Sequence, residues 1–360
     1  MSATTTSQAV REKSEAAVIS LRWIIGARDD LVWFIGSVLS SYALLALYVS
    51  GALPLLWMVG AWAILIDAPH VFGTFSRTYF DRSERRGRKR LLLGSLVFFT
   101  VGPLMVMAGL GLFFFFLAAL WAYYHLVKQH YGFMVLYKKK NNDLAAVDNA
   151  LDRVFLMLAF TYPFIAFVGG DNEAMSRVPP ILRFAFTGLE RALLFITIIT
   201  GLVWVGRQIQ RAVQSQPLNV PKYLLLLAAV PMHWIALMTP MPHKTIALVA
   251  ILTIYHNLQY HRLIWFHNKK YSRDERAREE YGAAALISKR LVYYIAFGVL
   301  FGLWYQGPRQ FVMSPMIEKT FWTEIVTSFL WGYAFIHYYL DSKIWRVRRD
   351  PNVGKALNMG

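Results

Sequence analysis

The sequence predicts an all-α membrane protein, a bundle of about ten membrane-spanning helices in one domain. Of its 360 residues, 56% are hydrophobic and only 16% are charged, whereas a soluble protein carries roughly 25% charged residues. The apolar runs are long and continuous, without the alternation that a membrane β-barrel would require. Lysine and arginine are confined to short blocks between these runs. Together these observations indicate helices that cross a bilayer.

Each predicted span follows from the length of its apolar run, because a helix needs about 20 mostly apolar residues to cross the hydrocarbon layer. The runs that qualify are residues 31–50, 52–73, 91–108, 110–137, 152–170, 187–206, 221–239, 245–267, 289–306 and 321–340. We expect residues 1–30 to form a cytoplasmic N-terminal segment, 31–345 the transmembrane domain and 346–360 a basic cytoplasmic tail. The apolar spacing of residues 14–25 is compatible with a helix that lies along the membrane surface.

The basic blocks predict the orientation of the chain. One such block follows every even-numbered span, for example Lys138, Lys139 and Lys140 after the fourth, whereas the loops at 170–186 and 240–244 carry few basic residues. Cytoplasmic loops are the ones enriched in Lys and Arg, so both termini should be cytoplasmic and the protein should lie in the inner or plasma membrane. The net charge of +17 then reflects contact with anionic membrane lipids. Nucleic acid is not an expected partner.

The residue types also narrow the chemistry. The chain has no cysteine, which excludes disulfides, thiolate metal sites, iron–sulfur clusters and cysteine nucleophiles. The motifs of nucleotide-binding proteins, serine hydrolases and zinc proteases do not occur in it. No site for an organic cofactor is expected. Histidine, aspartate, glutamate and water remain as the candidate metal ligands.

Histidines supply the main functional signal. Seven of the nine fall at a similar depth near the predicted cytoplasmic face, on four different spans. They are His70, His125, His130, His256, His261, His267 and His337. A single one of these would usually be an ordinary interfacial histidine, and we interpret His267 in this way. Several together indicate a functional interior, and imidazoles with nearby carboxylates suit iron, copper or zinc when sulfur is absent.

The spacing of these residues refines the prediction. Two pairs, Asp67–His70 and His337–Asp341, lie three and four residues apart and share a helix face. Each pair can provide two ligands, or one ligand and the carboxylate that orients it. The pairs His125–His130 and His256–His261 are five apart, about 140° around an α-helix. Both members of such a pair reach one metal only across a π-bulge, or they bind two metals.

These considerations give a set of candidate site residues. The candidate metal ligands are His70, His125, His130, His256, His261, His337 and Asp341. Asp67 and Gln129 are expected to support the ligands. Tyr124 and Tyr260 are candidate catalytic residues within an aromatic series that surrounds the histidines. That series is more often an interfacial belt than the wall of a substrate pocket.

Four of these motifs resemble the Brp/Blh family of membrane-embedded, iron-dependent β-carotene 15,15′-dioxygenases. The motifs are Pro69-His70, the histidine of span four, the segment IYHNLQYHRLIWF of span eight, and His337 with Asp341. The resemblance implies a non-haem iron site, one or two iron atoms, O₂ as co-substrate and a carotenoid-like substrate. It also implies iron ligands at His70, His125 or His130, His256, His261 and His337.

A second resemblance concerns the two histidine pairs with four residues between their members, which are similar to motifs of membrane fatty-acid desaturases and hydroxylases. That family also has adjacent histidines, and this chain has none. We therefore predict a membrane oxygenase that acts on a carotenoid-like or other lipid, with a redox partner as a further candidate. A di-iron desaturase or hydroxylase, a metal or proton transporter, and a pigment-binding subunit are the alternatives.

Overall fold

The computed structural model describes residues 19–359, except 171–174, 177–178, 273–276, 314–316, 319 and 348–349. The predicted all-α class is confirmed, since nearly all of this chain is helical. The strands within the described residues are β1 (Ile19–Ser20) and β2 (Leu218–Asn219), which pair in parallel. The chain forms two compact units, unit 1 with residues 1–30 and 130–239 and unit 2 with residues 31–129 and 240–360.

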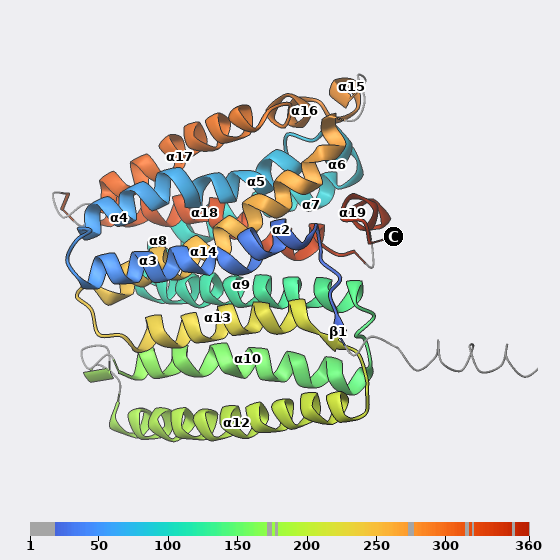
Figure 1. Ribbon diagram of the computed structural model, residues 1–360. Coiled ribbons are helices and arrows are strands. Elements are labelled where there is room, and N and C mark those ends of the chain that lie inside the picture. Colours follow the sequence, from blue (N-terminus) through green and yellow to red (C-terminus); the bar gives the residue numbers. More distant parts are fainter. Residues whose placement is uncertain are drawn as a thin grey trace, which may run out of the picture. The chain divides into compact units, whose positions relative to one another are not determined.

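Unit 1 is built mainly from long helices that run side by side. They are the C-terminal part of α9 (Gly111–Lys140), α10 (Ala146–Gly169), α12 (Pro180–Val213) and α13 (Val220–Met238), and the short α2 (Ala27–Asp29) also belongs to this unit. Helix α10 packs against both α12 and α13 (Figure 1). The Asn141 side chain fixes β1 by accepting from the Arg22 amide at 3.0 Å and from the Ser20 hydroxyl at 2.5 Å.

The N-terminal surface helix expected at residues 14–25 is not seen in its described part. Residues 19–20 form β1, and residues 21–26 are irregular. Pairing with β2 and the Asn141 side chain satisfy the backbone groups that a helix would have satisfied internally. Residues 1–18 lie outside the described residues.

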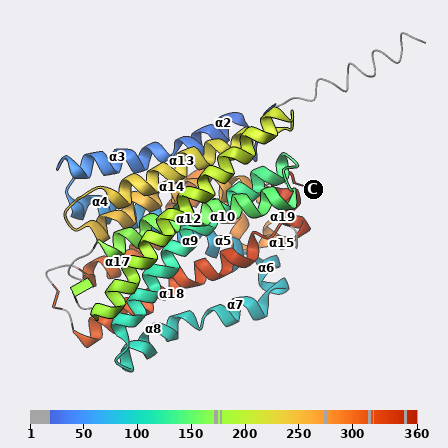
Figure 2. The same cartoon turned by 90° about the horizontal axis from the view of Figure 1, so that it is seen from below.

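Unit 2 contains the remaining helices. They are η1 (Asp30–Gly36), α3 (Val38–Val49), α4 (Leu55–Trp62), η2 (Ala63–Asp67), α5 (Ala68–Thr78), α6 (Arg82–Gly87), α7 (Lys89–Ser95), α8 (Phe98–Met107), the N-terminal part of α9, α14 (Lys244–His267), η3 (Asn268–Ser272), α15 (Ala277–Tyr281), α16 (Ala283–Ile287), α17 (Leu291–Met313), α18 (Phe321–Ile344) and α19 (Pro351–Ala356). Every residue of α5 is buried. Helices α14, α17 and α18 pack against it, and α7 and α8 lie along α18 (Figure 2). Helix α5 is therefore the central helix of unit 2.

Seven helical segments of the described chain are long and apolar enough to cross a membrane. They are Ala27–Val49, Leu55–Thr78, Lys89–Met107, Gly111–Lys140, Ala146–Gly169, Pro180–Val213 and Val220–Met238. They coincide with the first seven predicted spans. Helices α14, α17 and α18 occupy the last three predicted positions and are long enough but less apolar. The total of ten spans therefore stays a prediction.

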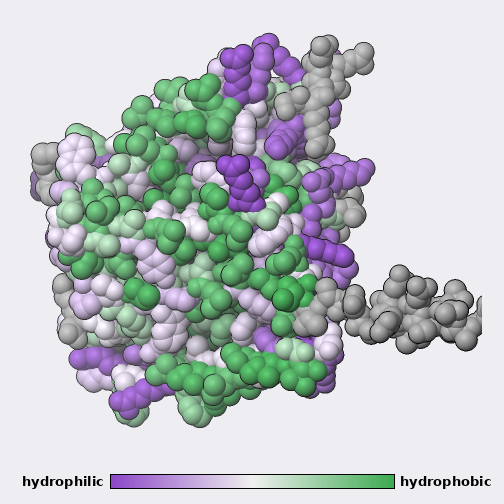
Figure 3. Space-filling view, viewed as in Figure 1, coloured by the Kyte–Doolittle hydropathy of each residue, from purple (hydrophilic) through white to green (hydrophobic). Residues whose placement is uncertain are grey.

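Apolar side chains cover the outer surfaces of both units, as expected for helices that face lipid. Figure 3 shows hydrophobic residues along α12 and α17. On α12, Ile181, Leu202 and Val213 are 72%, 69% and 81% exposed, and on α17 Trp304 is 68% exposed. Surfaces of this size and composition mark contact with a membrane or another apolar partner.

A π-helical turn, η2, stands directly before the central helix. Pro69 lacks the amide hydrogen that would bond to the carbonyl four residues earlier, which favours irregular helix geometry at this point. The neighbouring helix α17 approaches η2 closely, because a Cβ on Gly302 would lie 2.2 Å from the carbonyl oxygen of Ile64. Glycine at that position lets the two backbones meet. The turn lies where α5 begins and carries His70 toward the neighbouring helices.

A π-bulge was expected only if the paired histidines of α9 or α14 shared one metal. The structure has its π-helical turns at η1 and η2 instead, and α9 and α14 are α-helical through their histidine pairs. Members of each pair therefore point about 140° apart. This geometry allows one member of each pair to reach a given site.

Candidate metal centre

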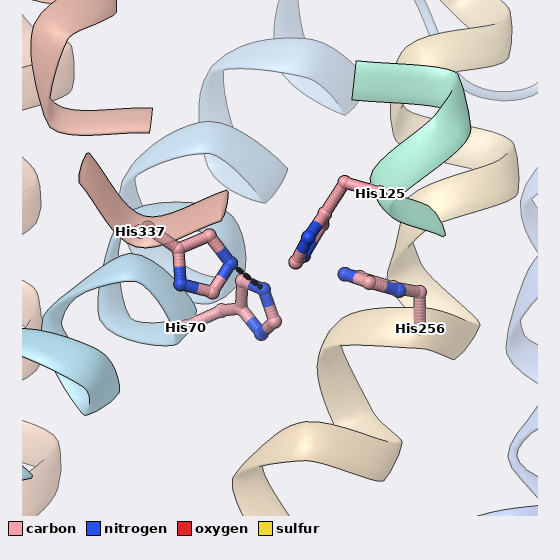
Figure 4. A group of neighbouring side chains, drawn as sticks. All are labelled: His70, His125, His256 and His337. Carbon is pink, nitrogen blue, oxygen red and sulfur yellow. Dashed lines mark hydrogen bonds between the residues drawn. The ribbon is translucent and has the colours of Figure 1, made fainter. Parts of the chain in front are cut away.

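Four histidines converge within unit 2. His70 comes from α5, His125 from α9, His256 from α14 and His337 from α18, and one ring nitrogen of each lies within 4.8 Å of the others (Figure 4). All four are buried, with exposures of 2%, 9%, 3% and 0% in that order. The rings point toward a common centre (Figure 4). Four helices thus each place one imidazole at the same point.

The distances between the rings suit a single metal ion. The Nε2 atoms of His70 and His337 are 2.8 Å apart, and the ring centroid of His125 lies 4.7 Å from that of His337 and 5.2 Å from that of His256. Nitrogen ligands bind such metals at about 2.1 Å, so two of them can be at most about 4.2 Å apart. A displacement of the rings by a few tenths of an ångström would bring all four nitrogens into bonding range.

The donor atoms themselves fit a metal. His125 Nε2 is buried and has no hydrogen-bond partner among the described residues. Buried polar atoms of this kind are rare and call for a partner. A set of four imidazole nitrogens, with no sulfur, suits iron, copper, zinc or nickel rather than magnesium or calcium. The cluster can therefore hold a transition metal.

A hydrogen-bond network fixes the orientation of one ligand. The hydroxyl of Thr74 donates to Asp341 Oδ1 at 2.6 Å, and the hydroxyl of Tyr260 donates to the same oxygen at 2.8 Å. Thr74 Oγ1 is also 2.8 Å from His337 Nδ1. A hydroxyl has only one proton to donate, so Thr74 must accept the Nδ1 proton of His337. The Nε2 lone pair of His337 is thereby directed into the cluster.

Asp341 therefore acts on His337 through Thr74 and not by direct contact. Its Oδ1 lies 3.7 Å from His337 Nδ1, too far for a good hydrogen bond. Of the two roles that the spacing of His337 and Asp341 allows, this geometry corresponds to a carboxylate that orients its histidine. Tyr260 closes the same network, and its ring centroid is 4.5 Å from that of His70.

Besides Asp341, two predicted histidine ligands lie outside the four-histidine cluster. His261 donates from Nε2 to the carbonyl of Ile66 at 3.1 Å and accepts at Nδ1 from the hydroxyl of Tyr294 at 3.1 Å. Both of its nitrogens are thus occupied, although its ring centroid is 6.2 Å from that of His70. His130 belongs to unit 1, where its ring lies 5.6 Å from that of His233. In each five-residue pair only the first member joins the cluster.

The remaining predicted residues, Gln129, Asp67 and Tyr124, are not members of the cluster. Gln129 donates to the backbone carbonyl of His256 at 2.7 Å and so links α9 to α14. Asp67 accepts hydrogen bonds from the side-chain amides of Asn257 and Gln306, and within the described part of the chain it has no hydrogen bond to a cluster histidine. Tyr124 is 51% exposed. It precedes His125 by one position, about 100° around the helix, and therefore faces away from the site.

Sequence reasoning missed Thr74. It follows His70 by four residues, so its side chain lies on the same face of α5. That spacing was a usable signal, but threonine is too common in helices for the spacing alone to indicate a role. Only its distance to Asp341 and His337, which come from the far end of the chain, reveals its function.

Comparison with known proteins gives no relative for this chain. No family model matches it, and neither a curated protein nor a solved structure matches it significantly. The fold and the site therefore define the class by themselves. This is a helical, membrane-type protein with a buried cluster of four histidines that can hold a metal.

Replacing Thr74 by valine should weaken metal binding by about 10–100-fold, because residues that orient a ligand typically have effects of that size. Valine keeps the shape of the side chain but leaves the Nδ1 proton of His337 without an acceptor. Thr78→Val is the matched control, since Thr78 is equally buried and its hydroxyl bonds only to the Thr74 carbonyl. Titration against a competing chelator measures the affinity. Equal affinities for the two variants would contradict the role assigned to Thr74.

Proposed function

We propose that this protein is an integral membrane oxygenase that holds non-haem iron in its four-histidine cluster and oxidises a lipophilic substrate with O₂. The observation that carries the proposal is the convergence of His70, His125, His256 and His337, from four helices, within 4.8 Å. The motifs that resemble the iron-dependent carotenoid dioxygenases include His70, His256 and His337 together with one histidine of span four, and this supports iron over the other metals that imidazoles bind.

The arrangement favours this function over the alternatives. A pigment-binding subunit would use its histidines one at a time, each in a separate pocket, whereas these four share one centre. A di-iron desaturase would need more ligands, and His130 and His261 are held elsewhere. Burial of all four rings below 10% exposure supports a resident ion over a transported one.

In this mechanism the four histidines would hold the iron, which would supply O₂ activation when bound. Thr74 and Asp341 keep the proton of His337 on Nδ1, so that Nε2 remains a ligand. Tyr260 holds a hydroxyl proton beside the cluster, hydrogen-bonded to Asp341. Tyr338 stacks on the His125 ring with centroids 4.4 Å apart, and aromatic packing of this kind excludes water from the reacting groups.

An apolar groove in unit 2 supports a lipophilic substrate. It lies between α8 and α18, has a volume of about 660 Å³ and is lined mainly by Phe99, Pro103, Leu104, Ile325, Val326 and Phe329. Helix α18 also carries His337, so the groove and the cluster share an element. An apolar molecule dissolved in the bilayer would reach the protein at a surface of this character.

Metal analysis of the purified protein, followed by a turnover assay, tests the proposal. We expect about one iron per chain, and O₂ consumption together with cleavage products when β-carotene or another polyene lipid is supplied. Protein stripped by a chelator should lose the activity and regain it when Fe²⁺ is restored. A protein that binds only zinc, or an iron-loaded protein that consumes no O₂ with any lipid offered, would refute the oxygenase.

A further inference from the structure

Unit 1 contains an interlocked set of mostly buried ion pairs that includes none of the four cluster histidines. Its members are Lys138, Asp143, Asp148, Asp152, Arg207, Arg211 and Lys222. Lys222 Nζ bonds to Asp143 at 2.8 Å and to Asp152 at 3.0 Å, and Lys138 also pairs with Asp152. Three buried cations, Lys138, Arg211 and Lys222, thus face the three carboxylates, and the partly exposed Arg207 adds a pair with Asp148.

The cations of this network favour the ionised form of the Asp143 carboxyl group. Burial alone would raise the pKa of the Asp143 carboxyl, but the adjacent Lys222, Lys138 and Arg211 hold that pKa below its usual value. An anion from outside the chain would therefore have to bind to donor groups that these carboxylates leave unused.

Arg211 is the member of this network that combines a place in the wall of a polar pocket with an unused donor. Its Nη1 donates to Asp143 at 2.8 Å and its Nη2 to the Pro217 carbonyl at 2.6 Å, whereas its Nε is buried without a hydrogen-bond partner among the described residues. The residue is 6% exposed. The pocket, of about 510 Å³, is lined by Ile19, Ser20, Leu21, Arg22, Asn141, Asn142, Asp143, Arg211 and Pro217.

A second guanidinium is available at the rim. Asn141 holds the backbone of Arg22 by accepting from its amide and donating to its carbonyl. The Arg22 side chain is exposed and makes no hydrogen bond or ion pair within the described part of the chain. The same rim carries Ile19 and Leu21, which are 54% and 53% exposed. The pocket therefore joins two guanidinium groups to an apolar edge.

We propose that this pocket binds the phosphate headgroup of an anionic phospholipid, with Arg22 and Arg211 as its partners. Guanidinium groups recognise phosphate through charge-assisted hydrogen bonds, and the apolar rim suits the start of the acyl chains. The basic segments beside the pocket are those that the charge pattern places in the cytoplasm, where anionic lipids are concentrated. A free phosphate ion would use the same guanidinium groups but would gain nothing from Ile19 and Leu21.

Native mass spectrometry of the full chain in detergent, titrated with phosphatidylglycerol or phosphatidylcholine, tests the proposal. The wild type should retain one phosphatidylglycerol in preference to phosphatidylcholine. Arg22→Ala should weaken phosphatidylglycerol binding about fivefold, which corresponds to about 1 kcal/mol for one basic residue at a membrane surface. Arg22 is exposed, so this variant should fold normally. Arg28→Ala removes an equally exposed arginine outside the pocket lining and should bind as the wild type does.

Three results would overturn the phospholipid site. They are equal retention of the two lipids, equal weakening by Arg22→Ala and Arg28→Ala, and displacement of the bound lipid by millimolar inorganic phosphate. The last result would assign the pocket to the free ion instead.

Discussion

Alanine at His256 should lower metal binding by more than about 100-fold, a larger loss than the 10–100-fold typical of residues that only orient a ligand. His256 supplies one of the four nitrogens that meet within 4.8 Å, and alanine leaves a gap that no neighbouring donor fills. Helix content should change little, because α14 is held by apolar packing along its length. Elemental analysis of the purified variant, together with circular dichroism, measures both outcomes.

The matched control is His261→Ala, on the same helix and five residues away. His261 is engaged by Ile66 and Tyr294, so its loss should leave most of the metal in place. The sequence alone makes both histidines equal candidates, and the structure distinguishes them. Loss of metal in His261→Ala with retention in His256→Ala would show that the ligand set is wrong.

Replacing Lys222 by methionine should destabilise the protein by about 3–5 kcal/mol, the usual cost of breaking a buried ion pair from one side. Lys222 is fully buried and contacts both Asp143 and Asp152, which would lose their shared cation. Thermal unfolding in detergent should therefore occur at a clearly lower temperature than in the wild type.

Arg153→Met serves as the control for Lys222→Met, because Arg153 is an exposed cation on α10. Its loss should change stability by no more than about 0.5 kcal/mol. Adding Asp143→Asn to Lys222→Met should restore part of the loss, since one unpaired carboxylate is then removed. Indistinguishable unfolding temperatures for the two single variants would contradict the energetic importance of the network.

Much of the fold follows from local sequence. The lengths of the apolar runs predict the first seven spans, because hydrocarbon thickness sets the length of a helix that crosses it. The π-helical turn η2 is different, since it depends on Pro69 together with the close approach of Gly302 from a distant helix. The strand β1 likewise depends on residues 218–219 and on Asn141. Contacts between residues so far apart in the sequence leave no local pattern from which they could be predicted.

The site, like the fold, has some features that local sequence predicts and others that depend on long-range packing. Composition and depth single out the histidines, and helical periodicity predicts that only one member of each five-residue pair reaches a given point. Which member does so depends on how α9 and α14 are rotated about their axes, and that rotation is decided by packing in the folded bundle. The hydrogen bond from the Gln129 side chain to the His256 carbonyl illustrates this, because it helps to fix which sides of α9 and α14 face each other. Thr74 could not be identified without the position of Asp341.

The order of the four histidines along the chain has a consequence for biogenesis. His70, His125 and His256 are synthesised well before His337, which lies in the last long helix. Helices enter the membrane as the ribosome delivers them, so a nascent chain can offer three nitrogens but not the fourth. Since metal binding and folding are coupled when ligands come from separate elements, a metal would gain its full set of four ligands only when α18 docks. Loading of such a metal would therefore be a late event that distinguishes the full chain from one that ends before α18.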